Sequence, residues 1–198
     1  MAKNKITEFL TKKERELLLR QPDQRKLMGL RDFCILSLMA NTGLRRAEVC
    51  GLNRKDLKVE GKKLVLFIWG KGGHQRKSFI KNTELILALE RYFKMIGNPE
   101  NPEAPMFYQA KFQKTAGPQR MSVSTIRFLV ARHIKSANIQ KHITAHSLRH
   151  TFLTLALQSG ADLATVKALA GHASVATTSR YLHTSEELME KAIERLAL

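Results

Sequence analysis

Most of the chain has the hydrophobic pattern of α-helices, in which apolar residues recur every three to four positions. Helices are predicted over residues 11–20, 29–42, 45–52, 83–95, 122–137, 146–158, 162–170, 175–182 and 186–196. Thr11 and Glu14 have the spacing of a capping box at the start of the first helix. Gly43 and Gly160 directly follow apolar helical runs, and glycine at that place is typical of a helix end.

One short stretch has the composition of β-strands instead. Residues 64–69 (LVLFIW) are rich in strand-forming side chains, and a second short run follows at 77–80. The glycine-rich residues 70–73 between them predict a β-hairpin with a loose tip, whereas the prolines of 98–105 predict a loop. The expected fold class is therefore mostly α with a small antiparallel β-sheet.

The charge of the chain points to a polyanionic partner. Lysine and arginine total 34 against 17 acidic residues, a formal net charge of +17. Between Glu103 and Glu186 the only acidic residue is Asp162, so the positive charge is concentrated rather than spread evenly. Basic side chains bind phosphates and release counterions, which favours nucleic acid without distinguishing DNA from RNA.

Several classes of protein are not expected from the sequence. The sequence contains no apolar run of about 18 residues, so no membrane span is expected. The first residues lack the pattern of a secretory signal. Cys34 and Cys50 both lie in apolar helical patterns and are expected to be buried free thiols in a reducing cytoplasm.

Residues 146–152, HSLRHTF, place two histidines and an arginine in about one helical turn without an acidic residue. Other polar residues also stand at element starts or turns, where functional side chains are commonly presented. They are Arg45, Glu48, Lys71, His172 and Tyr181. Each one alone has an ordinary structural explanation as a surface, capping or core residue, so only their combination indicates function.

That combination resembles the tyrosine recombinases, also called the phage integrase family. The matching motifs are TGLRRAE (42–48), GKG (70–72), HSLRH (146–150) and LAGHASVATTSRY (169–181), in that order along the chain. The resemblance extends from about residue 7 to residue 196. It implies the tyrosine recombinase catalytic-domain fold and an enzyme that cleaves and rejoins DNA.

The resemblance assigns Arg45, Arg149 and His172 to the scissile phosphate. An arginine fork is permanently charged and binds two oxygens at once, so a pair can neutralise charge that develops in the transition state. Glu48 is expected to orient Arg45, and His150 to support the site by packing or hydrogen bonding.

The resemblance makes Tyr181 the nucleophile that forms a 3′-phosphotyrosine link. A phenol titrates near ~10, so its deprotonation needs help, and His146 is the expected base. Lys71 is the expected general acid for the 5′-oxygen leaving group.

No metal or other cofactor is expected. His142, His146 and His150 are spaced four residues apart, as in some zinc sites on helices. However, no cysteine or acidic residue between Glu103 and Asp162 completes a ligand set, and Arg149 would repel a cation.

The expected function is site-specific recombination for integration, excision or resolution of a mobile element or replicon. Two alternatives stay open, a catalytically silent DNA-binding module and a DNA-relaxing enzyme resembling type IB topoisomerases. The expected partner is double-stranded DNA. The helix at 122–137 is the expected DNA contact, through Arg127, Arg132 and Lys135. A prokaryotic or phage-encoded protein associated with the nucleoid in the cytoplasm is expected.

We expect one catalytic domain over residues 1–198, with residues 1–10 as a lead-in and no separate N-terminal core-binding domain. The segment 185–198 has one apolar face, formed by Leu188, Met189, Ala192, Ile193 and Leu196. This helix either folds back on its own core or docks on a neighbouring protomer. The resemblance favours docking, within a tetramer that pairs two DNA sites.

Overall fold

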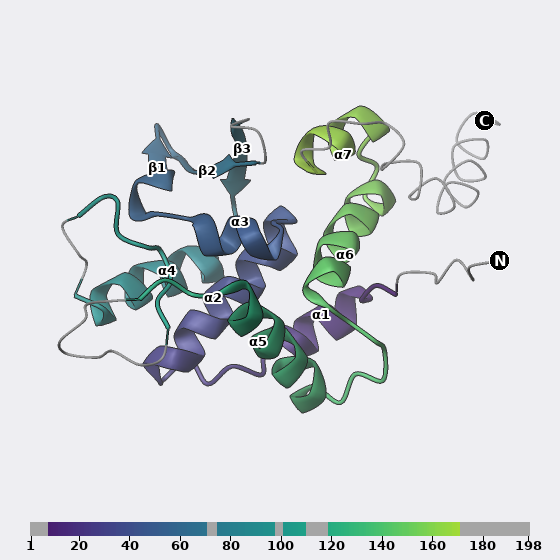
Figure 1. Cartoon of the computed structure of the whole chain (residues 1–198). Helices are drawn as coiled ribbons and strands as arrows, with labels where there is room; N and C mark the ends of the chain where they lie inside the picture. Colours follow the sequence, from purple (N-terminus) through teal and green to yellow (C-terminus); the bar gives the residue numbers. More distant parts are fainter. Residues whose placement is uncertain (1–7, 71–74, 98–100, 110–118, 171–198) are drawn as a thin grey trace, which may run out of the picture.

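The computed structural model of the chain describes residues 8–70, 75–97, 101–109 and 119–170 (Figure 1). Over these residues the helices are α1 (Lys12–Leu19), α2 (Leu27–Thr42), α3 (Arg46–Gly51), α4 (Thr83–Met95), α5 (Val123–Ser136), α6 (Ala145–Gln158) and α7 (Leu163–Ala170). A short 3-10 helix spans Arg54–Asp56. The strands are β1 (Leu57–Glu60), β2 (Lys63–Trp69) and β3 (Gln75–Ile80).

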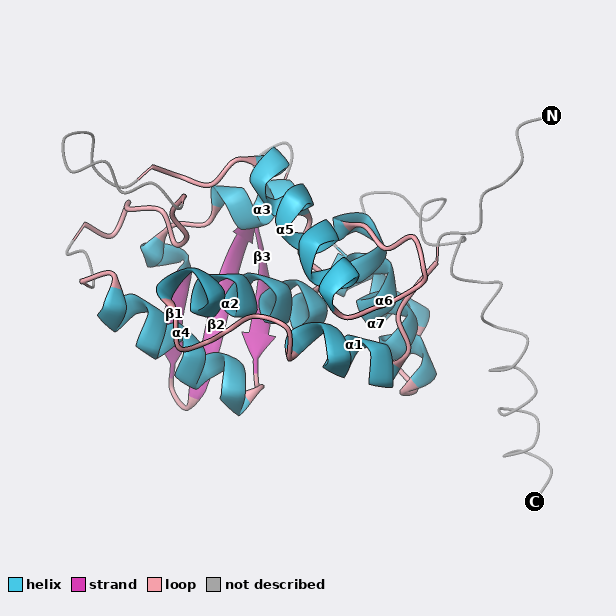
Figure 2. Ribbon diagram, turned by 90° about the horizontal axis from the view of Figure 1, so that it is seen from below, coloured by secondary structure: helices cyan, strands magenta, loops and turns pink. Residues whose placement is uncertain are grey.

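The three strands form an antiparallel sheet in the order β1-β2-β3. Leu66 of β2 pairs with Leu57 on one side and Ser78 on the other, which fixes the register. Because side chains alternate between the faces of a strand, Leu64, Leu66 and Ile68 all point to one face, where they join the hydrophobic core. Helices α2 and α4 lie across that side of the sheet (Figure 2).

Helix α2 is the centre of the core. Its side chains are buried around most of the helix from Leu30 to Ala40, and it packs on α1, α4, α6 and β3. A helix that is apolar on all sides is stable only when other elements surround it. The apolar pattern of residues 29–42 therefore corresponds to a central helix.

Helices α6 and α7 form a smaller hydrophobic cluster of their own. Leu153 and Leu157 of α6 pack with Val166 and Ala170 of α7.

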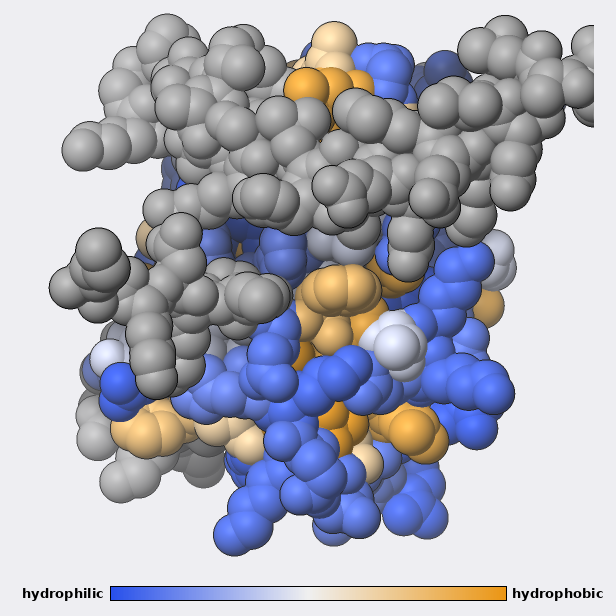
Figure 3. Space-filling model, turned by 90° about the vertical axis from the view of Figure 1, so that its right-hand side faces the viewer, coloured by the Kyte–Doolittle hydropathy of each residue, from blue (hydrophilic) through white to orange (hydrophobic). Residues whose placement is uncertain are grey.

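On the face shown in Figure 3, hydrophilic side chains surround a limited area of hydrophobic ones. Among the described residues, no helix has the length and apolarity needed to cross a membrane.

The structure confirms the predicted fold class and most predicted elements. Thr11 and Glu14 form the expected capping box, and Gly43 ends α2 in the left-handed conformation with φ 64°. The strand β1 was not predicted, because its sequence LKVE alternates charged and apolar residues over only four positions. The predicted helices at 175–182 and 186–196 lie outside the described residues.

Candidate active site

Gly43 is the turn that connects α2 to the first arginine of the site. Its φ of 64° is favourable for glycine, and its N–H caps α2 by donating to the Met39 carbonyl at 3.0 Å. A Cβ at this position would lie 2.5 Å from Cδ1 of Phe152 on α6. The turn therefore needs glycine for two reasons, its conformation and the close approach of α6.

Arg45 lies immediately before α3 and is held by Glu48, one turn later. The Arg45 backbone N–H donates to Glu48 Oε2 at 2.8 Å, and its Nη1 donates to Oε1 at 3.0 Å. The Arg45 side chain is 42% exposed, whereas that of Glu48 is only 6% exposed. Glu48 thus fixes the direction of a guanidinium that still faces solvent.

Arg76 of β3 is a further part of this arrangement that the sequence analysis missed. Its Nη1 and Nη2 donate to the two carboxylate oxygens of Glu48, each at 2.8 Å. The alternation of β3 contained the signal, since Arg76 shares the inward face with the buried Ser78 and Ile80. A two-point contact of this kind is geometrically specific, so Arg76 fixes the orientation of Glu48.

The charges around Glu48 determine its protonation. Burial by itself would raise the pKa of Glu48, but the hydrogen bonds from Arg76 and from the Arg45 backbone, with the charges of both arginines, lower it overall. Glu48 is therefore a carboxylate at neutral pH.

Arg149 is the second arginine of the site and is almost fully buried, at 1% exposure. It lies in the second turn of α6, and its Nη1 donates to the Gly43 carbonyl at 2.7 Å. Its Nη2 donates to the carbonyl of Ala170, the last residue of α7. One side chain therefore joins α6, the end of α7 and the turn that leads to Arg45.

His146 and His150 lie one turn apart at the start of α6. Thr144 caps this helix in a box with Ser147, and His146 is exposed in the first turn. His150 is half-buried, with its ring edge-on to Phe9 at a centroid distance of 5.8 Å. Burial lowers the pKa of His150, and the neighbouring His146 lowers it further, which favours neutral His150.

Histidine spacing in this region does not correspond to one helical face. His142 precedes α6, and its backbone N–H donates to Glu8 at 2.6 Å. Within the part of the chain that the structure describes, no group of three or more histidine, cysteine or acidic side chains is arranged to hold a metal ion. Cys34 and Cys50 are free thiols, the first buried and the second half-buried.

The structure brings Arg45, Glu48 and Arg149 together around the Gly43 turn. Lys71, His172 and Tyr181 lie outside the described residues. In sequence, His172 follows two residues after Ala170, whose carbonyl Arg149 contacts.

The expected DNA-contact residues lie on a different element, α5. Arg127, Arg132 and Lys135 are all exposed there. Arg132 also donates to the buried carboxylate of Asp32 on α2, and the Arg127 guanidinium lies 4.9 Å from the ring centroid of Phe128. Arg132 therefore contributes to the fold in addition to any role at the surface.

Comparison with known proteins matches this chain to the phage integrase family over residues 8–187. The chain belongs to the phage integrase family. A tyrosine recombinase XerC of Pelobacter propionicus is 36% identical over 174 residues, which cover 87% of this chain and 54% of that protein. The chain spans about half the length of the curated relatives that it matches.

Solved structures of family members have the same fold. XerH site-specific recombinase, in a post-cleavage complex with its palindromic difH substrate, superimposes with a TM-score of 0.81 at 25% identity, over 98% of this chain and 55% of that one. XerA recombinase gives a TM-score of 0.78 at 28% identity, over 95% of this chain and 66% of that one. These likenesses confirm the expected tyrosine recombinase catalytic-domain fold.

Proposed function

We propose that this chain is the catalytic part of a site-specific DNA recombinase, which acts in integration, excision or resolution of DNA. Membership of the phage integrase family supports this proposal, as do relatives named tyrosine recombinase and the DNA-bound XerH complex. The partner is double-stranded DNA, and the reaction needs no metal.

The observation that supports this function best is the hydrogen bond from Arg149 Nη1 to the Gly43 carbonyl, at 2.7 Å. Gly43 is two residues before Arg45, so this bond ties the Arg149 guanidinium to the turn that precedes Arg45. Two planar, permanently charged forks attached to the same turn suit a single phosphodiester, whose non-bridging oxygens gain charge in the transition state. Within the described part of the chain, the Arg45 side chain donates hydrogen bonds only through Nη1. Its remaining donors can therefore reach a phosphate.

In the proposed reaction the phenolic oxygen of Tyr181 attacks phosphorus while the bond from phosphorus to the 5′-oxygen breaks. His146 accepts the phenolic proton, and Lys71 donates a proton to the leaving 5′-oxygen. His172 donates a hydrogen bond to a non-bridging oxygen. The phosphotyrosine link conserves the energy of the broken bond, so a 5′-hydroxyl can reverse the reaction without ATP.

Two surfaces complete the proposal. Arg127, Arg132 and Lys135 of α5 contact the DNA backbone, and each lost phosphate contact reduces the salt dependence of binding.

The segment 185–198 docks on a neighbouring protomer and couples the subunits of a tetramer on DNA. Removing residues 185–198 should leave DNA binding intact and abolish cooperative assembly, as measured by sedimentation of the protein–DNA complex. Unchanged sedimentation would exclude this coupling.

A suicide substrate tests the chemistry directly, because a nick beside the scissile phosphate lets the short cleaved fragment diffuse away and traps the adduct. The unmodified chain should form a covalent protein–DNA adduct, which Tyr181→Phe abolishes and Arg149→Ala weakens. DNA binding without any adduct would identify a silent binding module. Adduct formation with relaxation of supercoils and no strand exchange would identify an enzyme of the topoisomerase type.

A further inference from the structure

The outer face of the sheet, which points away from the core, combines aromatic rings with lysines. We define this outer face by Lys58, Lys63, Phe67, Trp69, Lys77 and Phe79. Along β2, Phe67 and Trp69 alternate with the core residues Leu66 and Ile68 and so point outward. The register places Lys77 opposite Phe67, and both Lys58 and Phe79 opposite Val65.

Two of the three rings of this outer face, those of Trp69 and Phe79, are exposed to solvent, while Phe67 is half-buried. Trp69 is 55% exposed and Phe79 is 51% exposed, although large apolar side chains are stabilised by burial. Lysine ammonium groups lie over the rings: Nζ of Lys58 and of Lys77 lie 5.2 Å and 4.9 Å from the centroid of Phe67. Lys63 Nζ lies 5.7 Å from the centroid of Phe79.

The charge of the outer face is positive. Glu60 also points to this side, opposite Lys63 in the register, and Lys77 Nζ donates to it at 2.9 Å. One carboxylate against Lys58, Lys63 and Lys77 leaves the face with a net positive charge. Exposed rings and ammonium groups together match the two parts of a single-stranded nucleic acid, whose bases stack on rings while its phosphates attract cations. A duplex fits less well, because its bases are already stacked inside the helix.

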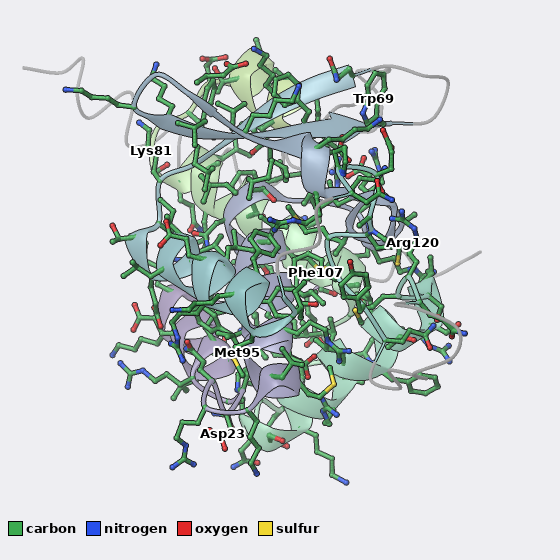
Figure 4. The ribbon with its side chains drawn as sticks, turned by 90° about the vertical axis from the view of Figure 1, so that its left-hand side faces the viewer. Asp23, Trp69, Lys81, Met95, Phe107 and Arg120 are labelled. Atoms are coloured by element: carbon green, nitrogen blue, oxygen red, sulfur yellow. The ribbon has the colours of Figure 1, made fainter. Side chains whose placement is uncertain are left out.

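We propose that the outer face binds an unpaired DNA strand by stacking bases on Phe67, Trp69 and Phe79. The inference rests on the proposed function, in which cleavage leaves a free 5′-end that must unpair before it joins a new partner. Trp69 stands at the end of the sheet opposite Lys81, and in sequence it is two residues before Lys71, the expected acid for that 5′-oxygen (Figure 4). The outer face therefore begins close in sequence to the residue that releases the strand.

Trp69 is the only tryptophan of the chain, so its fluorescence reports on this face alone. We would titrate the full chain carrying Tyr181→Phe, to prevent cleavage, with an oligothymidylate and with a blunt duplex of the same length. The oligothymidylate should quench Trp69 emission and the duplex should quench it much less. Equal quenching by both, or none by the oligothymidylate, would overturn the proposal.

Variants test whether the named side chains are responsible. Phe67→Ala or Phe79→Ala should weaken oligothymidylate binding by about 5- to 150-fold, the range for loss of one stacked base. Lys58→Gln and Lys63→Gln should each reduce the slope of log affinity against log salt by about 0.7. Leu87→Ala and Lys94→Gln on α4 are matched controls, since both side chains are exposed away from this face. Control effects as large as those of the outer-face variants would contradict the assignment.

Two more outcomes separate this inference from the proposed function. If polyglutamate quenches Trp69 as strongly as the oligothymidylate does, the face is an acidic-peptide site and the proposal is wrong. If the unmodified chain forms the adduct but the oligothymidylate does not quench Trp69, the recombinase proposal stands and only the proposed strand-binding role of the outer face is contradicted. If the oligothymidylate quenches Trp69 but the unmodified chain forms no adduct on the suicide substrate, this inference stands and the recombinase proposal is contradicted.

Discussion

Two buried carboxylates in this molecule are each held by two arginines, yet their surroundings differ. Glu48 receives Arg45 and Arg76 beside the Gly43 turn, and Asp32 receives Arg31 and Arg132 between α2 and α5. The Glu48 and Asp32 side chains are 6% and 1% exposed. The same chemical group therefore occurs twice, once beside the candidate active site and once in the core.

The difference lies in where the arginines point. The Arg31 side chain is 5% exposed, and its third hydrogen-bonding nitrogen donates to the Tyr108 carbonyl at 2.7 Å, so its donors are used within the fold. The Arg45 side chain is 42% exposed and directs unused donors to solvent. The comparison teaches that pairing with a buried carboxylate does not by itself make an arginine structural, since Arg45 keeps donors directed to solvent while Arg31 uses its donors within the fold.

The largest expected effect is loss of stability in Asp32→Ala. This change leaves the buried Arg31 without its carboxylate and should lower the free energy of unfolding by roughly 3–5 kcal/mol. Urea denaturation followed by circular dichroism measures it. Asp23→Ala, which removes a carboxylate that is one-third exposed and paired with the exposed Arg25, is the control and should lower the midpoint far less. An equal loss of stability in both variants would show that Asp32 contributes no more to the fold than Asp23 does.

Arg45→Ala should reduce activity while leaving stability almost unchanged. The rate of adduct formation on the suicide substrate should fall by about 10²–10³-fold, as when one donor to transition-state charge is removed. Stability should change by less than about 1 kcal/mol, because the side chain is largely exposed and Arg76 still holds Glu48. Arg46→Ala is the matched control, an exposed neighbour that should keep its adduct rate.

A smaller effect is expected for Arg76, which acts through Glu48. Arg76→Lys keeps the charge and loses the two-point contact, so the adduct rate should fall by roughly 10-fold, or about 1.4 kcal/mol. DNA affinity, measured by anisotropy, should stay the same because Arg76 orients a neighbour. Arg76→Ala should be slower than Arg76→Lys. Loss of affinity in step with rate would assign Arg76 to the DNA itself.

The smallest effect is the pH dependence of stability. Burial opposes ionisation of Asp32 and Glu48, but the His133 hydrogen bond and Arg31 charge at Asp32, and the Arg76 and Arg45 contacts at Glu48, lower both pKa values overall. Their stabilisation is complete above the unfolded values, near ~4. It should be lost as pH falls through the lower folded values, by at most about 1.4 kcal/mol per pH unit for each group. Denaturation at pH 3 to 6 should show a shallower loss for Glu48→Gln.

The sequence alone predicted the elements whose patterns are long or whose ends are chemically marked. Helix α2 is apolar over most of its length, α1 begins at the Thr11 cap, and Gly160 follows α6. The contact between Glu48 and Arg45 could also be predicted, since a carboxylate three residues after Arg45 lies one helical turn away. These are local relations within one element.

What the sequence did not predict are contacts between elements far apart in the chain. Arg76 meets Glu48 only because β3 packs beside α3, and Arg132 meets Asp32 across a separation of 100 residues. The hydrophobic pattern predicts which face of an element is buried, but it does not specify the partner across the interface. The surface role expected for Arg132 was therefore incomplete.

The Gly43 turn gives the two arginines a common reference point. Its carbonyl accepts the hydrogen bond that positions Arg149, and the direction in which the chain leaves this turn determines where the backbone of Arg45 lies. Phe152 occupies the space that a larger residue would need, so the turn is clamped from the side of α6. Any displacement of this peptide would shift both positive charges in concert, which makes their mutual spacing less sensitive to thermal motion than the place of either one.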